Sequence, residues 1–143
     1  MTTSVKRKGT QWERDFVNLI NEEIKGANAK RIAGSGSIGT ALREPLLQGD
    51  IKATFKGFSN NFRIEAKVGY GGNKQLTVKK EWLDKIKEEA GNSYSIPALA
   101  CKFSGAKKVD GVQYMIVLDF DTFKYIMNTV YDLDTALRNN SNH

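Results

Sequence analysis

An alternating pattern at residues 62–68 is the feature that most limits how this chain can fold. In the segment FRIEAKV, small or apolar side chains alternate with charged ones. Successive side chains of a strand point to opposite faces, so the pattern predicts a half-buried strand with Glu65 and Lys67 side by side on one face. An exposed Glu–Lys pair is common and contributes little to stability, so the pair alone indicates no function.

The segments on either side of this strand predict an α/β order. The apolar run IPALACKF suits a strand that is covered on both faces of a sheet. In the helix expected at 78–90, Trp82 and Ile86 share an apolar stripe, which predicts a core position for Trp82. The order α-β-β-β-α-β-β-α predicts a single α/β domain with helices around a mixed sheet. The expected elements are helices at 10–25, 78–90 and 120–130, strands at 31–33, 51–55 and 62–68, a turn at 59–61, and strands in IPALACKF and VQYMIVLDF.

The first expected helix carries a carboxylate on its apolar side. The segment TQWE has the form of a capping box, in which Thr10 opens the helix and Glu13 bonds back to it, and Gly26 then ends the helix. At about 100° per residue, Glu13 falls among Val17 and Ile20. It is therefore either a capping residue or a carboxylate directed at a site beneath the helix start, and the helix alone leaves both roles open.

The composition restricts the class of protein. With 143 residues, 40% hydrophobic and 27% charged, the chain is expected to form one soluble domain. We place this domain at 9–138, between a flexible basic N-terminus at 1–8 and a disordered tail at 139–143. No apolar run could span a bilayer, and the basic N-terminus lacks the apolar stretch of a signal peptide. We therefore expect no membrane partner and a cytoplasmic location.

Counts of cysteine, histidine and charge narrow the possible sites. The single cysteine, Cys101, excludes an intramolecular disulfide framework and a multi-cysteine zinc site, and its apolar neighbours predict a buried thiol. The single histidine, His143, lies in the expected tail, which argues against a serine-hydrolase triad. Lys and Arg outnumber Asp and Glu by 22 to 16, and the net charge of +6 suits a polyanion such as nucleic acid without proving one.

Two acidic residues are expected to meet at one end of a predicted hairpin. Asp50 precedes the strand that begins at Ile51, and Glu65 lies on the next strand, so pairing of the two strands would bring the carboxylates together. Neighbouring carboxylates are costly unless a cation neutralises them, and oxygen ligands suit a hard ion such as Mg²⁺. Such an ion activates water and polarises phosphate, while Lys67 could hold that water or stabilise transition-state charge. These residues predict metal-assisted phosphodiester hydrolysis.

Asp50, a gap and then Glu65-Ala66-Lys67 resemble the PD-(D/E)xK nuclease signature, with QGD in place of the usual PD. The segments KRKGTQWERDFVNLI, RIAGSGS, GDI, IEAK and PALACKF follow in order over residues 6–103. Together they resemble the archaeal-type Holliday junction resolvase family, which is also found in phages. The resemblance implies a restriction-endonuclease-like mixed β-sheet flanked by helices, in a protein that works in an archaeal cell or a phage host.

The same resemblance implies an activity and an assembly. Family members are Mg²⁺-dependent endonucleases, with Mn²⁺ as a substitute ion, and they resolve four-way DNA junctions by paired symmetric cuts. Two active sites are needed for the two cuts, so the resemblance implies a homodimer with branched DNA as its partner. We expect an apolar dimer interface from the PALACKF and YMIVLDF strands and nearby helices.

The resemblance also assigns roles to single residues. It implies a metal site of Glu13, Asp50 and Glu65, with Lys67 as the catalytic lysine. The serine near the scissile phosphate corresponds to Ser35, with Ser37 as a close rival because the loop before Asp50 is longer than in the shortest family members. The basic residues expected to contact DNA are Arg14, Arg31 and Lys102.

Two other functions fit the same residues. One is a PD-(D/E)xK nuclease that cuts linear duplex, as restriction or repair enzymes do. The other is a DNA-binding module whose acids no longer hold a metal, although such a module has no reason to keep the three acids and Lys67. Arg14, Arg31 and Lys102 could equally be solvated surface charges.

Overall fold

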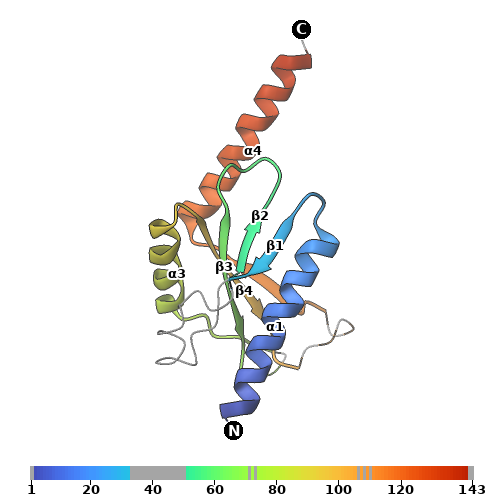
Figure 1. Cartoon of the computed structure of the whole chain (residues 1–143), viewed down its shortest axis with the longest axis vertical. Helices are drawn as coiled ribbons and strands as arrows, with labels where there is room; N and C mark the ends of the chain where they lie inside the picture. Colours follow the sequence, from blue (N-terminus) through green and yellow to red (C-terminus); the bar gives the residue numbers. More distant parts are fainter. Residues whose placement is uncertain are drawn as a thin grey trace.

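A mixed β-sheet forms the centre of the fold (Figure 1). A computed structural model of the chain describes residues 2–32, 51–70, 72, 74–105, 107, 109 and 111–141. Within them the sheet has five strands in the spatial order β1-β2-β3-β4-β5. The strands are β1 (Asn28–Arg31), β2 (Ile51–Thr54), β3 (Phe62–Val68), β4 (Ile96–Lys102) and β5 (Tyr114–Val117).

The strand directions follow from the connections between them. β3 and β4 pair in parallel, which requires a crossover, and helix α3 (Lys80–Asn92) supplies it. The other neighbouring pairs are antiparallel. The predicted order of elements and the predicted mixed sheet flanked by helices are therefore confirmed.

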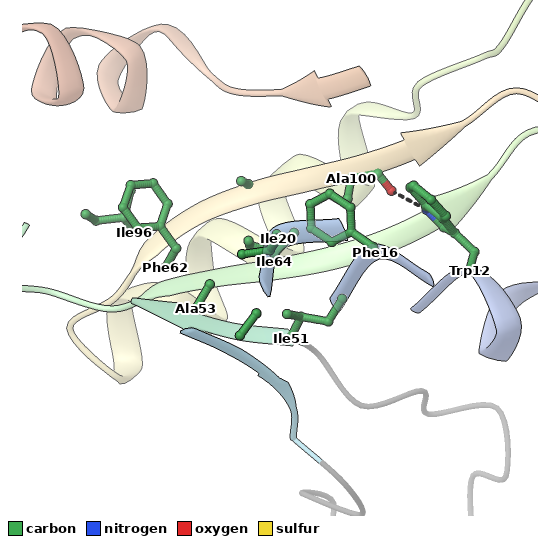
Figure 2. Packing of buried hydrophobic residues seen from close by; sticks show 11 residues of the cluster. Trp12, Phe16, Ile20, Ile51, Ala53, Phe62, Ile64, Ile96 and Ala100 are labelled. Carbon is green, nitrogen blue, oxygen red and sulfur yellow. Dashed lines mark hydrogen bonds between the residues drawn. The ribbon is translucent and has the colours of Figure 1, made fainter. Parts of the chain in front are cut away.

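Helix α1 (Thr2–Glu23) packs against one face of the sheet. Its buried residues Trp12, Phe16 and Ile20 are spaced by four, so they lie on one side of the helix. They meet buried side chains of the strands, including Ile51 and Ile64 (Figure 2). The opposite face of the sheet carries a second cluster of Ile86, Leu99 and Cys101 beneath α3. Both clusters include residues of β4, which confirms that this strand is covered on both faces.

The indole of Trp12 fixes α1 to the middle of the sheet. Its Nε1–H donates a hydrogen bond of 2.9 Å to the carbonyl oxygen of Ala100 on β4 (Figure 2). Ala100 is paired with Ala66, the residue between Glu65 and Lys67. The bond therefore sets the height of α1 along β3 at the level of the Glu–Lys pair.

The two terminal helices are longer than the sequence pattern predicts. α1 begins at Thr2, so Thr10 lies inside the helix and the predicted capping box is wrong. Helix α4 runs from Phe120 to Ser141 and includes part of the segment that was expected to be a disordered tail. α4 extends away from the sheet, towards the end of the molecule opposite to the start of α1 (Figure 1).

Candidate active site

Glu65 and Lys67 project from the α3 side of β3. Their neighbours Ile64 and Ala66 pack into the core beneath α1, and strand alternation sends the two charged side chains to the other face. The Nζ atom of Lys67 lies 3.4 Å from Oε1 of Glu65, and the two side chains are 30% and 17% exposed. The predicted side-by-side pair is therefore present, and it is largely withdrawn from solvent.

The Lys67 ammonium also contacts Trp82 of α3. The Nζ atom lies 4.8 Å from the centroid of the indole ring, which is a cation–π distance. Trp82 also packs against the cluster of Ile86, Leu99 and Cys101, as its apolar stripe predicts. Its contact with Lys67 was not expected, because no sequence spacing links a helix residue to a particular strand residue across a crossover.

One oxygen of Glu65 is unsatisfied within the described part of the chain. Oε2 is buried and accepts no hydrogen bond there, while Oε1 faces Lys67. A buried carboxylate oxygen without a donor is costly, and a cation would offset that cost. An oxygen donor of this kind fits a hard divalent ion such as Mg²⁺.

The second predicted metal ligand, Asp50, lies outside the described residues, as do both loop serines, Ser35 and Ser37. The next residue, Ile51, is paired with Ile64 in the antiparallel β2–β3 register. The expected hairpin pairing is thus confirmed at the residues adjacent to Asp50 and Glu65. Among the described residues, no group of three or more His, Cys, Asp and Glu side chains that could hold a metal ion occurs.

The third predicted ligand, Glu13, is buried in the apolar side of α1, with 1% of the residue exposed. Its Oε1 lies 3.4 Å from Nε of Arg31 on β1. The helix that carries Glu13 covers the sheet face opposite to the one from which Glu65 and Lys67 project. The structure therefore brings Glu13 together with Arg31, one of the residues expected to contact DNA.

The other two predicted DNA contacts lie apart from this pair. Arg14 is exposed on α1. Lys102 is half-buried at the end of β4, and its Nζ lies 5.9 Å from the centroid of the Trp12 ring. Neither position tests a contact with DNA, so both roles stay predictions.

Cys101 lies directly beside the Glu–Lys pair and is fully buried. It is paired with Lys67 in the parallel β3–β4 register. Burial raises the pKa of the thiol to about 11, the Lys67 ammonium opposes this rise and the Glu65 carboxylate adds to it. The predicted buried thiol is confirmed, and at neutral pH it is uncharged.

Comparison with known proteins identifies one family. Residues 4–142 match the model of a family described as "Phage putative PDDEXK endonuclease". No curated protein matches the chain. Within the described part of the chain, no helix is both long and apolar enough to cross a membrane. The match covers nearly the whole chain, so the chain belongs to the family described as "Phage putative PDDEXK endonuclease".

Proposed function

We propose that this protein is a Mg²⁺-dependent endonuclease that resolves four-way DNA junctions. The family supports an endonuclease. The observation that carries the active site is the Glu65–Lys67 pair, in which Glu65 has one unsatisfied carboxylate oxygen and the Lys67 ammonium contacts both Glu65 and the Trp82 ring. Junction specificity is supported by the ordered resemblance over residues 6–103 to the archaeal-type resolvases.

Glu65, Asp50 and Glu13 would hold the metal ion. When bound, the ion would supply a polarised phosphate oxygen and a water of lowered pKa. Glu13 now faces Arg31 on the α1 side of the sheet, so its entry into the site would require it both to leave this contact and to reach the other side of the sheet. Loss of the contact would release the Arg31 guanidinium to bind a phosphate of the DNA.

Lys67 would stabilise the negative charge that develops on the phosphate. Its ammonium has three N–H donors, and Glu65 occupies one direction while the Trp82 ring limits another. The remaining donor would be available to a phosphate oxygen or to the attacking water. A donor that is fixed before the reaction stabilises transition-state charge without the cost of reorganising.

A homodimer would supply the two active sites that paired cuts require. The PALACKF strand, which was expected in the dimer interface, is β4. It lies inside the sheet and its residues from Ala98 to Cys101 are buried within the chain, so it cannot form that interface. β5 and α4 instead expose apolar side chains to solvent, including Ile116, Phe123 and Val130. An apolar groove of about 410 Å³, lined in part by Ile24 and Ile116, opens beside them. These surfaces support β5 and α4 as the dimer face.

The test is a competition between equal amounts of a four-way junction and a linear duplex, with and without Mg²⁺. We expect symmetric cuts in the junction only when Mg²⁺ is present. Lys67→Met should cut the junction about 10²- to 10³-fold more slowly, while Lys124→Met, at an exposed position of α4, should cut like the wild type. Equal cutting of the junction and the linear duplex would indicate instead that the protein is a nuclease that cuts linear duplex, as restriction or repair enzymes do.

Metal binding can be followed without activity. A ligand that binds the folded state raises its stability by about 2.7 kcal/mol when present at 100 times its Kd. We expect Mg²⁺ or Mn²⁺ to raise the Tm of the wild type and to leave the Tm of Glu65→Gln nearly unchanged. Binding of metal without cutting of any DNA would favour the non-catalytic module.

A further inference from the structure

A basic hollow lies on the sheet face that carries Glu65 and Lys67. It has a volume of about 510 Å³, and none of the described residues that line it is acidic. Neither the sequence pattern nor the resemblance singled out this group as a whole. Its basic lining residues are Lys30, Lys52 and Arg63, together with Arg31, whose guanidinium pairs with Glu13 on the α1 side. Ser93 and Ser95 also line it.

Three of these cations form one row across three adjacent strands. Lys30 of β1 is paired with Lys52 of β2, and Lys52 is paired in turn with Arg63 of β3. Their strand neighbours Ala29, Ala53 and Ile64 are buried beneath α1, so alternation sends all three basic side chains to the opposite face. Adjacent strands are about 4.8 Å apart, which brings the three charges close together.

A row of like charges at this spacing is destabilising unless an anion binds it. Lys30 is exposed and Lys52 is half-exposed, and neither forms an ion pair with a carboxylate of the described residues. The hydroxyls of Ser93 and Ser95 already bond to backbone carbonyls and to each other, so the basic side chains set the charge of the hollow. Its chemistry therefore favours a polyanion over an apolar or cationic ligand.

The row lies next to the proposed reaction centre. Arg63 and Glu65 are two residues apart on β3 and share a face, so their Cα atoms are about 6.6 Å apart. Successive phosphates of one DNA strand are also close, with one for roughly every 3.4 Å along the helix axis. Lys67 and Arg63 are four residues apart on β3, so their Cα atoms are about 13 Å apart. A strand with one phosphate at Lys67 can thus place a phosphate a few nucleotides away at Arg63 and Lys52.

We propose that Lys30, Lys52 and Arg63 form a phosphate-binding row that holds the DNA backbone on one side of the scissile phosphate. This proposal rests on the proposed nuclease function for the position of the cut. The row aligns the strand before reaction, and its contribution is to binding rather than to the chemical step.

The first test measures affinity for the junction against salt concentration in the absence of divalent metal. Each lost phosphate contact should reduce the slope of log K against log salt by about 0.9. We expect this reduction for Lys52→Gln and for Lys30→Gln, and recovery of the slope in Lys52→Arg. The matched control is Lys124→Gln, which removes an exposed lysine on α4. Circular dichroism confirms that each variant is folded.

The second test locates the contact on the DNA. Neutral methylphosphonates are placed one at a time beside the cut, and the loss of affinity is measured for wild type and Lys52→Gln. At one position we expect the neutral phosphate to weaken the wild type and not the variant. The proposed phosphate-binding row is wrong if, at every position, the methylphosphonate weakens Lys52→Gln as much as it weakens the wild type. It is also wrong if the salt slope is unchanged in both Lys52→Gln and Lys30→Gln.

The two proposals fail in different ways. A wild type that cuts the junction while the row variants bind like it refutes the row and leaves the nuclease function standing. A wild type that cuts no DNA, yet loses phosphate contacts when Lys52 is changed, refutes the nuclease function and supports the row as a DNA-binding site.

Discussion

At the scale of single residues, Lys67 is the side chain on which the proposed chemistry depends most. Two lysines face the Trp82 ring, Lys67 at 4.8 Å and Lys79 at 5.9 Å, but only Lys67 also faces Glu65. Loss of one fixed donor to a developing oxyanion lowers kcat by about 10²- to 10³-fold. We expect Lys67→Met to lose cleavage by this amount in single-turnover assays.

Lys79→Met provides the control for this change. It removes an ammonium from the same ring, but Lys79 is largely exposed and pairs only loosely with Glu81 at 4.0 Å. We expect it to cut like the wild type. Equal losses in both variants would mean that the charge around Trp82, and not the position of Lys67, supports activity.

The raised pKa of the Cys101 thiol leads to a prediction of how the free energy of unfolding depends on pH in the alkaline range. Burial raises the pKa of the thiol from 9.0 to about 11, so the folded state keeps the proton to higher pH than the unfolded chain does. Stability from this group is fully present below pH 9 and is lost as the pH rises through 11. The full loss is about 2–3 kcal/mol.

Urea unfolding between pH 8 and 10.5 measures this effect. The free energy of unfolding should fall less steeply with pH in Cys101→Ala than in the wild type, because the variant lacks the thiol. Lysine and tyrosine titration is common to both proteins and cancels in the comparison. Identical slopes in the two proteins would show that the Cys101 pKa is not raised.

At the scale of elements, the packing of α1 depends on one polar contact inside the core. The Trp12 indole donates to the Ala100 carbonyl and stacks on Tyr114 at 5.0 Å. Trp12→Phe removes this donor and its hydrogen bond, which typically contributes a net of about 0.5–1.5 kcal/mol. Urea unfolding should show this loss, whereas Gln11→Ala at the neighbouring exposed position should stay within about 0.5 kcal/mol of the wild type.

The strands and the central helix could be predicted, but the ends of the outer helices could not. Thr10 was expected to cap α1, yet a cap contributes only about 1 kcal/mol, and the lysines and arginine before it favour a helix. Gly9 costs roughly the same and does not stop the helix. α4 continues to Ser141 because no glycine or proline follows Gly111.

The candidate site was predictable where one strand supplies its parts. Glu65 and Lys67 share a face through the two-residue period of β3, which a sequence shows directly. The contact of Glu13 with Arg31 and that of Lys67 with Trp82 join separate elements, and their geometry depends on helix packing. The row of Lys30, Lys52 and Arg63 depends on strand register, which becomes visible only when the sheet is assembled.

At the scale of the whole molecule, helix α4 leaves a large part of its apolar surface exposed to solvent. Its Leu133 contacts the β2–β3 turn, where the side-chain atom would lie 2.9 Å from a Cβ added to Gly57. Phe123, Met127, Val130 and Leu137 recur along the helix at intervals of three, four and seven residues and are 44–68% exposed. An apolar stripe with this spacing is typical of a helix that packs against another helix, which supports a dimer through α4.

The dimer leads to a prediction that joins assembly to reaction outcome. Val130→Glu places a charge in the middle of the exposed stripe, whereas Asn128→Glu places the same charge about 200° away around α4. Burying an unpaired carboxylate is costly, so sedimentation should find Val130→Glu monomeric and Asn128→Glu dimeric at equal concentration.

On a supercoiled plasmid that extrudes a cruciform, the dimeric control should give linear product directly, because both strands are cut in one binding event. Val130→Glu should give nicked circles, because the first nick releases the supercoiling that maintains the cruciform. If Val130→Glu remains dimeric, α4 is not the interface; if it is monomeric and still linearises the plasmid, paired cutting does not need the dimer.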